Sequence, residues 1–331
     1  MVNPILKFLS SITKQGLIIP VYHAISNSSP AHLKHLYGVR TVKEFENDLD
    51  YLLMHYKPLD INDFLNDLKE GKEFRKKGFL LTFDDGLREV FEVVRPILLS
   101  KGIPAIVFLN SRFVDNRDIF FRYKASILLE NLKLMGDSSS TRKEIKKVLN
   151  LDGSDYESIR KSIFGLGYED SGKFEILARL LEVDFMKYLK DTKPYLDSDQ
   201  IKTMIKEGFI FGGHSIDHPF YNNLTHDLQL KQTFESVKTV EERFAMDSGL
   251  FAFPFTDFGI TKTFFEDIYS CKTPKIYASF GTAGLKKDTY AQHFQRIPVE
   301  NYSRSLSSTV LFEHLYYLLK VLFGKNKIVR K

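Results

Sequence analysis

The feature that most constrains the fold of this chain is an apolar run that ends in two adjacent carboxylates and a glycine. Residues 79–86 read Phe-Leu-Leu-Thr-Phe-Asp-Asp-Gly. A short, continuous apolar run of this kind is typical of a strand buried in a parallel sheet, and in α/β folds the following loop is where sites are built. At a buried strand end, Asp84 and Asp85 would repel each other unless a cation or a proton separates their roles. The simpler alternative is a turn that only ends the strand, with Gly86 in a left-handed conformation.

A second apolar run ends in two glycines and is followed by two histidines. Residues 209–219 read Phe-Ile-Phe-Gly-Gly-His-Ser-Ile-Asp-His-Pro, which places imidazoles at His214 and His218. Histidines four residues apart converge on one ion if the segment forms a helical turn. With Asp85 they make an Asp-His-His set that leaves coordination positions open for water and substrate. Such a pair is weak evidence alone, but each motif follows its own predicted strand, and together they predict a metal site.

Residues 82–86, Thr-Phe-Asp-Asp-Gly, and residues 214–218, His-Ser-Ile-Asp-His, resemble the first and second motifs of the polysaccharide deacetylases. This is the NodB-homology group, carbohydrate esterase family 4, and the resemblance covers roughly residues 18–110 and 193–300. It implies an α/β fold, a distorted (β/α) barrel, with a divalent metal that is usually zinc. It also implies removal of N-acetyl groups from sugars. Carried over position by position, it makes Asp84 the general base, and the metal ligands are then Asp85, His214 and His218.

Two further segments resemble parts of the same family. Residues 22–23, Tyr-His, match a permuted branch that includes the poly-N-acetylglucosamine deacetylases, in which this pair supplies the general acid, and the resemblance therefore assigns that role to His23. On general grounds, a lone histidine after a strand is more often a structural hydrogen-bonding group. Residues 251–257, Phe-Ala-Phe-Pro-Phe-Thr-Asp, resemble the third motif, which implies that the backbone N–H of Phe255 helps to form the oxyanion site.

The chain also departs from the family pattern. Ala252 stands where many members carry an arginine that orients the base, and Thr256 stands where a glycine is usual. Either Arg296 takes over the role of that arginine or the role is missing. The chain contains no tryptophan, so the family's tryptophan motif is absent in its usual form. These departures keep open a second interpretation, a carbohydrate-binding relative without catalytic activity.

Length and composition favour a globular protein. At 331 residues with 43% hydrophobic residues, the chain fits one barrel-sized domain with an insertion, or two domains. The single cysteine, Cys271, excludes internal disulfides and suits a reducing compartment. The net charge of +5 is mild, and no basic cluster is interleaved with aromatics, which argues against nucleic-acid binding. The start of the chain lacks a secretory signal pattern, so we expect a cytoplasmic protein, with association with the inner face of the membrane as an extension.

The sequence changes character between residues 114 and 192, where charges become dense and helical periodicity replaces strand runs. The stretch from Asp85 to His214 is about twice as long as one or two βα units require. We therefore predict a discontinuous barrel over residues 1–113 and 193–305 and a largely helical insertion over 114–192. Within the insertion, residues 121–124, Phe-Arg-Tyr-Lys, are the candidates for substrate contact.

The last unit, residues 306–331, is predicted to be an amphipathic helix with a basic tail. Its leucines at helical spacing are Leu311, Leu315, Leu318 and Leu322. The simplest expectation is that this helix packs on the barrel. The alternative is an interfacial membrane anchor whose basic tail contacts an anionic leaflet.

Together these features predict a metal-dependent hydrolase that removes N-acetyl groups from an N-acetylated sugar or glycan, with Asp84 as base and His23 as acid. A zinc ion at the Asp-His-His set would lower the pKa of a bound water and polarise the acetyl carbonyl. Besides the non-catalytic relative, the remaining alternative is the same site acting on an O-acylated or a lipid-linked sugar.

Overall fold

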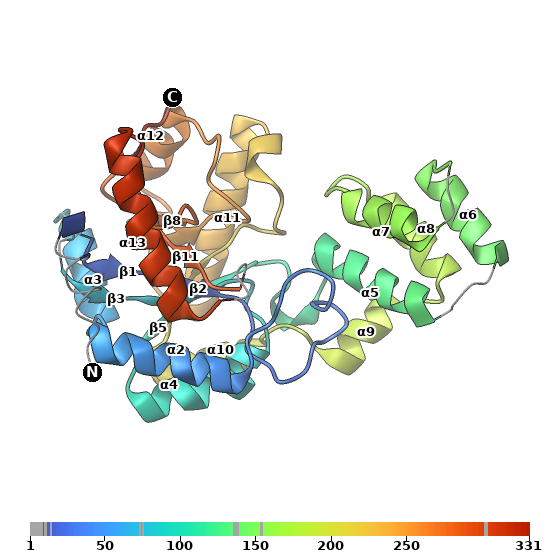
Figure 1. The fold of residues 1–331 in the computed structure, drawn as a ribbon, viewed down its shortest axis with the longest axis horizontal. Helices are drawn as coiled ribbons and strands as arrows, with labels where there is room; N and C mark the ends of the chain where they lie inside the picture. The colour runs from blue at the N-terminus through green and yellow to red at the C-terminus, as the bar shows by residue number, and fades with distance from the viewer. Residues whose placement is uncertain are drawn as a thin grey trace.

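A parallel sheet curved into a nearly closed barrel forms the core of the larger part of the molecule, on the left in Figure 1. The computed structural model describes residues 9, 12–13, 15–72, 74, 76–134, 139–152, 155–300 and 304–331. Eight strands follow the order β10-β8-β7-β6-β5-β4-β2-β11, and helices flank them. The distorted (β/α) barrel expected from the sequence is therefore confirmed. Residues 1–8, where we expected no secretory signal, lie outside the described residues.

The barrel strands are short, and all of them run parallel. In chain order they are β2 (Pro20–Tyr22), β4 (Leu81–Phe83), β5 (Ala105–Leu109), β6 (Ile210–Gly213), β7 (Leu250–Ala252), β8 (Ala278–Gly281), β10 (His293–Gln295) and β11 (Ile297–Pro298). Two small pairs complete the described strands: β1 (Leu17–Ile18) with β3 (Gly78–Phe79), and β9 (Lys287–Asp288) with β12 (Lys327–Ile328). Because the barrel strands are parallel, their carboxyl ends meet at one end of the barrel, which is where such folds carry their sites.

The sheet closes at a single bend in the chain. β10 pairs with β8 and β11 pairs with β2, and only Arg296 separates these two strands. The backbone N–H of Arg296 donates to the Gly281 carbonyl at 3.1 Å, and that of Ile297 donates to the Ile19 carbonyl at 2.8 Å. Consecutive residues therefore join the two ends of the sheet, and Arg296 lies at the seam.

Alternate residues of the strands belong to different apolar clusters, as the strand period of two requires. In β5, Ile106 and Phe108 pack with Phe280 of β8, whereas Val107 packs in a second cluster that includes Phe45. Both clusters are almost fully buried. The loops that follow the strands therefore project from a rigid base.

The helices around the barrel are α2 (Val42–His55), α3 (Ile61–Lys69), α4 (Arg95–Lys101), α10 (Ser198–Lys206), α11 (His226–Phe244), α12 (Lys262–Ser270) and α13 (Leu306–Leu322), with short helical turns η1 (Val90–Val94), η2 (Val114–Asn116) and η3 (Tyr221–Asn223). A capping box begins α2, since the Thr41 side chain accepts from the Glu44 N–H and the Glu44 side chain accepts from the Thr41 N–H. The turn η1 is π-helical and leads directly into α4.

Between β5 and β6 the chain forms α5 (Phe121–Leu134), α6 (Ser139–Leu149), α7 (Tyr156–Gly165), α8 (Ser171–Leu180) and α9 (Phe185–Thr192), which lie to one side of the barrel (Figure 1). Their apolar cluster also contains Ala24 and Leu87 from the loops after β2 and β4. The helical segment is thus packed against the carboxyl end of the barrel. The division of the chain into units at residues 113, 192 and 305 stays our interpretation.

Helix α13 packs on the molecule through a face other than the leucine stripe. Its buried apolar residues are Leu306, Val310 and Tyr317. In contrast, Leu315 is 47% exposed and Leu322 is 78% exposed. The helix therefore packs on the molecule as expected, and the leucine stripe does not supply the buried face. Among the described helices, none is long and apolar enough to cross a bilayer.

Candidate active site

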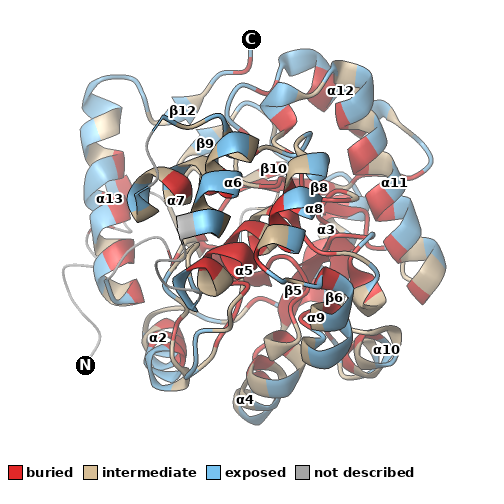
Figure 2. Cartoon of the chain, turned by 90° about the vertical axis from the view of Figure 1, so that its right-hand side faces the viewer, coloured by how far each residue is buried: buried red, intermediate tan, exposed pale blue. Residues whose placement is uncertain are grey.

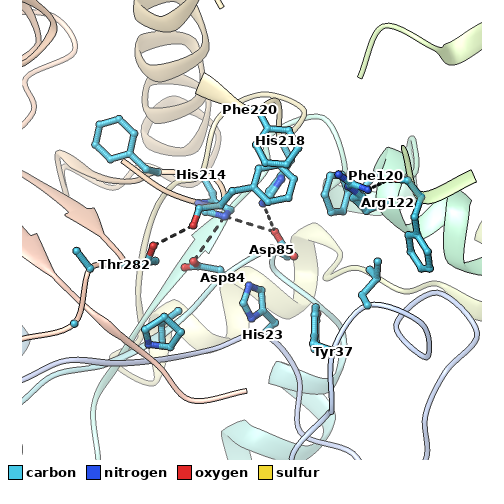
Figure 3. A pocket seen from close by; sticks show the side chains of 18 of the residues that line it. His23, Tyr37, Asp84, Asp85, Phe120, Arg122, His214, His218, Phe220 and Thr282 are labelled. Carbon is cyan, nitrogen blue, oxygen red and sulfur yellow. Dashed lines mark hydrogen bonds and ion pairs between the residues drawn. The ribbon is translucent and has the colours of Figure 1, made fainter. Parts of the chain in front are cut away.

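The predicted site residues lie together around one cleft at the carboxyl end of the barrel (Figure 3). His23 follows β2, Asp84 and Asp85 follow β4, and His214 follows β6. The cleft has a volume of about 750 Å³. Its walls extend from the barrel to the helical segment and to α13, through Phe255, Arg122, Arg160, Tyr316 and Lys320.

The three predicted metal ligands converge. Asp85 Oδ1 lies 3.6 Å from His214 Nε2 and 3.3 Å from His218 Nε2, and all three side chains are buried. His214 Nδ1 lies 2.8 Å from the Ala252 carbonyl oxygen, an acceptor, so this nitrogen carries the proton. The Nε2 lone pair of His214 is therefore directed at the centre of the group.

The atoms at this centre fit a bound cation. Asp85 Oδ2 accepts a hydrogen bond from the Tyr123 hydroxyl at 2.7 Å, whereas the buried Asp85 Oδ1 has no hydrogen-bond partner in the described part of the chain. A buried carboxylate oxygen without a donor is costly unless a cation satisfies it. Burial lowers the pKa of His214 to about 4 and that of His218 to about 3, so both are neutral at pH 7, the form that binds metal.

The histidines do not converge through a helical turn, and that sequence-based expectation is wrong. Residues 214–218 form a loop after β6, in which Ser215 and His218 have φ angles of 67° and 62°. The end of β5 holds this loop, because the Asn110 side chain donates to the His214 carbonyl and the Ser111 N–H donates to the Ser215 carbonyl at 3.2 Å. The His218 N–H in turn donates to Ser215 Oγ at 2.9 Å. Hydrogen bonds from the end of β5 thus hold the two histidines in place, as a helical turn would have done.

Asp84 is held by the arginine at the seam of the barrel. Arg296 Nη1 and Nη2 donate to the two carboxylate oxygens at 2.6 and 2.8 Å, and both side chains are buried. Burial raises the pKa of Asp84, but Arg296 and His214 outweigh burial and lower it to about 2. Arg296 therefore contacts Asp84 as an arginine that orients the base would. Ala252 contacts the site only through its backbone carbonyl, which bonds His214.

His23 faces the cleft from below the two aspartates (Figure 3) and is paired with Glu300. The His23 Nδ1 donates to Glu300 Oε2 at 2.5 Å, and the backbone N–H groups of His23 and Ala24 donate to Oε1 at 2.9 and 3.1 Å. The His23 side chain keeps 28% exposure, whereas Glu300 is buried. Burial lowers the pKa of His23, but Glu300 outweighs burial and raises it to about 9.

Sequence reasoning missed Glu300. The usable signal was its position, because it lies two residues after β11 and so stands at the carboxyl end of the same sheet as His23. A charged residue shortly after a strand of a parallel sheet is a site candidate by the argument that found Asp84 and Asp85.

Phe255 lies at the rim of the cleft in a strained backbone conformation. Its φ angle is 55°, a left-handed value that is unfavourable for a bulky residue. Its ring stacks on Phe220 at 3.7 Å between centroids and contacts His218 at 4.5 Å, and the Thr282 hydroxyl donates to its carbonyl at 3.0 Å. Within the described part of the chain, no hydrogen bond is formed by the N–H of Phe255.

The helical segment also reaches the cleft through residues 121–124. The fully buried Tyr123 bonds Asp85, and Arg122 lines the cleft while it donates to the Phe164 carbonyl. A second link is the Tyr168 hydroxyl, which donates to Asp217 at 2.7 Å, between the two histidines. Sequence reasoning suspected substrate contact here, and that stays a prediction; the contact with the Asp85 carboxylate was missed, because α5 is distant from Asp85 in the sequence.

Comparison with known proteins gives one family and several similar folds. The family model for polysaccharide deacetylase matches residues 71–266. The Streptococcus pyogenes deacetylase PplD, solved in complex with acetate, has a TM-score of 0.54 at 15% identity and covers 89% of this chain and 97% of its own. IcaB from Ammonifex degensii has a TM-score of 0.53 at 18% identity, with coverage of 90% and 95%.

A third similar structure is a de-N-acetylase from Aggregatibacter actinomycetemcomitans, with a TM-score of 0.53, 12% identity and coverage of 88% of this chain and 99% of that one. At these identities the structural likeness shows a common fold. No curated protein sequence matches the chain.

Proposed function

The chain belongs to the polysaccharide deacetylase family and is a carbohydrate deacetylase, and from this premise we propose that it hydrolyses the N-acetyl group of a sugar or glycan with the residues of the cleft. The observation that carries the proposal is the side-by-side arrangement of an ionised carboxylate, Asp84, and a converging ligand set around Asp85. Amide hydrolysis requires an activated water, a stabilised oxyanion and a protonated amine. The cleft offers a candidate group for each requirement.

The metal-binding part of the proposal concerns Asp85, His214 and His218. Two imidazoles and a carboxylate form a ligand set that zinc binds well, and three protein ligands leave a position open. When bound there, the ion would lower the pKa of a water molecule and polarise the acetyl carbonyl. The Ala252 carbonyl and the Tyr123 hydroxyl orient the ligands, because each bonds the ligand atom that faces away from the centre.

Asp84 is the proposed general base. Its Oδ2 lies 3.7 Å from His214 Nε2, so it borders the ligand set, and the proposal does not count it among the ligands. Arg296 bonds both carboxylate oxygens, which fixes the orientation of Asp84 and keeps it ionised at neutral pH. In this role Arg296 replaces the arginine that many family members carry at the position of Ala252.

His23 and Phe255 complete the proposed reaction. His23 donates a proton to the leaving amine, since Glu300 keeps the imidazole protonated at neutral pH. The N–H of Phe255 donates to the developing oxyanion, a role that its missing hydrogen-bond partner and fixed left-handed backbone support.

The test is acetate release from N-acetylglucosamine oligomers by zinc-loaded protein. Wild-type protein should release acetate, and Asp84→Asn should lower kcat by about 10²- to 10⁴-fold, the usual contribution of a general base. Zinc titration by calorimetry should still show one site in the variant. Asp118→Asn, a change of a half-buried aspartate on the loop before α5, is the control and should keep the wild-type rate. Wild-type rates in Asp84→Asn would remove Asp84 from the role of base.

A second candidate substrate, a sugar carried by a lipid, is favoured by one observation. Tyr316 and Lys320 of α13 line the cleft, and the same helix exposes a row of large apolar side chains. The chemistry of the site would be unchanged. Since the chain is a carbohydrate deacetylase, the alternative of a non-catalytic binding protein is dropped.

A further inference from the structure

Helix α13 is apolar on two faces, and the molecule covers one of them. The exposed stripe, here named the α13 apolar face, consists of Phe312, Leu315, Tyr316, Leu319, Leu322 and Phe323. Their spacing places them on one continuous side of the helix. Leu322 is 78% exposed and Phe323 is 73% exposed, which are values for side chains that touch almost nothing. The outer side of α13 is correspondingly exposed in Figure 2.

This concentration of apolar surface stands out within the molecule. Seven of the eighteen large hydrophobic residues that are exposed in the described part of the chain lie within residues 312–323. The others are scattered over separate elements, which is normal for a protein surface. A contiguous apolar stripe, in contrast, marks an interaction surface.

Positive charge surrounds the end of the α13 apolar face. Residues 306–331 contain five lysines and arginines and a single glutamate, so this segment carries +4 of the net charge of +5. One of the five, Arg330, is buried and bound to Asp257 and Asp288. The pairing of β12 with β9 adds two further lysines beside the tail. The resulting lysine rim consists of Lys286, Lys287, Lys325 and Lys327.

The lysine rim is not neutralised by the protein. In the described ranges no carboxylate forms an ion pair with any of its four members. Two acidic residues are engaged in other contacts: Asp288, next to Lys287 in the sequence, accepts from Arg330 at 2.6 Å, and Glu313 accepts from the Leu285 N–H at 2.9 Å. An anionic partner would therefore meet uncompensated charge.

We propose that the α13 apolar face docks on an anionic lipid bilayer, with the lysine rim at the level of the headgroups. A helix with a large apolar stripe beside cations lies in the membrane interface, and each lysine near an anionic surface strengthens binding about fivefold. A second copy of the chain fits less well. In a two-fold dimer through this face, the lysine rim of one copy would meet either the second lysine rim or the opposite end of the face, where Arg304 lies over the Phe312 ring, so like charges would repel in both arrangements.

Docking in this way places the bilayer beside the cleft. Tyr316 belongs to the α13 apolar face and also lines the cleft, and Lys320 Nζ lies over its ring at 3.7 Å from the centroid. If the cleft deacetylates a sugar as proposed above, its substrate is presented at a membrane surface. Membrane docking does not depend on that activity, so an experiment can contradict the docking proposal and leave the proposed deacetylation standing, or the reverse.

The experiment is co-sedimentation of the full chain with vesicles of phosphatidylglycerol and phosphatidylcholine in equal amounts, at low salt. We expect binding to these vesicles and at least tenfold weaker binding to vesicles of phosphatidylcholine alone. Added salt should weaken the binding to anionic vesicles, because it screens the lysine rim. Equal binding to both vesicle types, or no binding to anionic vesicles, would overturn the proposal.

Two pairs of variants assign the binding to this surface. Leu319→Ser/Leu322→Ser should weaken vesicle binding at least tenfold, and Lys325→Gln/Lys327→Gln should weaken it by about 25-fold at low salt, from fivefold per lysine. The matched control is Leu134→Ser/Met186→Ser, which changes equally exposed apolar residues on α5 and α9 and should bind as wild type.

Sedimentation velocity without lipid tests the alternative that a second copy of the chain covers the α13 apolar face. A monomer for the wild type agrees with the proposal. A dimer that Leu319→Ser/Leu322→Ser converts to monomer, with no vesicle binding by either protein, would show that a second copy covers the face and would overturn the proposal.

Discussion

Two buried clusters in this protein contain the same types of residue, aspartate and histidine, but differ in the partners that surround them. One contains Asp85 with two histidines, and the other contains Asp257, Asp288 and His293. In each cluster, atoms able to bind a metal lie within 4.8 Å of one another. Composition and proximity do not separate the two, so the difference must come from what already satisfies their atoms.

The second cluster is closed by an arginine. Arg330 donates to both Asp257 and Asp288, and Gln295 donates to Asp257 at 2.8 Å. Burial raises the pKa of Asp257, but His293 and Arg330 reverse that effect and hold it well below its usual range. A cation of the protein itself thus occupies the place that a metal would take, and the cluster fastens the C-terminal residues to the barrel.

The first cluster is left open. The arginine nearest to it, Arg296, bonds Asp84 and leaves Asp85 Oδ1 without a donor. We infer from this contrast that a ligand site can be distinguished from a structural ion network by its unsatisfied atoms. The predictions that follow test this distinction.

The largest effect is expected from a matched pair of substitutions, Asp85→Asn and Asp288→Asn. Both exchange a buried carboxylate for an amide of the same size. In Asp85→Asn the zinc affinity should fall by more than the roughly 100-fold known for groups that only orient a ligand. Asp288→Asn should leave zinc binding at wild-type affinity. Calorimetric titration of chelator-stripped protein measures both, and an equal loss in the two variants would abolish the distinction between the clusters.

Substitutions in the second cluster, which Arg330 closes, should lower the stability of the fold and leave zinc affinity unchanged. Arg330→Met leaves Asp257 and Asp288 buried without their cation, and breaking such a group costs about 3 kcal/mol of unfolding free energy. Because the folded-state pKa of Asp257 is depressed, its contribution is present above its usual pKa of 3.8 and is lost as the pH falls toward the folded value. Urea unfolding at pH 7 and at pH 2.5 to 3, below the usual pKa, measures this loss.

The control for Arg330 is Arg243→Met, which breaks a more exposed pair with Asp115. It should cost about 1 kcal/mol or less. If the two arginine variants lose the same unfolding free energy, the network around Asp257 stabilises the fold no more than an ordinary ion pair does. Zinc affinity should be unchanged in both.

The sequence predicted the open cluster well because its evidence is local. Asp84 and Asp85 end one apolar run and the histidines follow another, and parallel strands bring such ends together without further information. The closed cluster depends on Arg330, whose partners lie in distant segments. No local sequence pattern predicts an ion pair between residues so far apart in the chain.

The sequence did not predict which face of α13 is buried, for a related reason. Its sequence is apolar around most of the helix, so periodicity gives two candidate packing faces. The buried choice is fixed by tertiary contacts, such as the Leu306 N–H donating to Asp48 at 3.1 Å. Periodicity predicts that a helix forms, and the surroundings decide which side is covered.

A third prediction compares the two histidine–carboxylate pairs. His23 with Glu300 faces the cleft, whereas His293 with Asp257 is enclosed. Glu300→Gln removes the charge that raises the pKa of His23 to about 9, so the alkaline limb of the kcat/KM profile should move toward the ordinary value of 6.5. The sign follows because a lower pKa deprotonates the acid at lower pH.

The matched control for Glu300 is Glu313→Gln, which also lines the cleft but bonds the Leu285 N–H. Its alkaline limb should stay in place. An unmoved limb in Glu300→Gln would remove His23 as the group whose ionisation sets that limb.

The smallest effect is expected at Tyr123, the residue through which the helical segment touches the open cluster. Tyr123→Phe leaves Asp85 Oδ2 without its donor, so the carboxylate is less firmly oriented and the zinc affinity should fall about tenfold. Tyr195→Phe is the control, since this hydroxyl accepts from the Phe120 N–H and its ring lies 6.1 Å from that of Tyr123 without bonding a ligand. Zinc titration should show the loss in Tyr123→Phe alone. Equal affinities in the two variants would mean that the helical segment packs against the cluster without orienting it, and that the unsatisfied oxygen of Asp85 is enough to define the site.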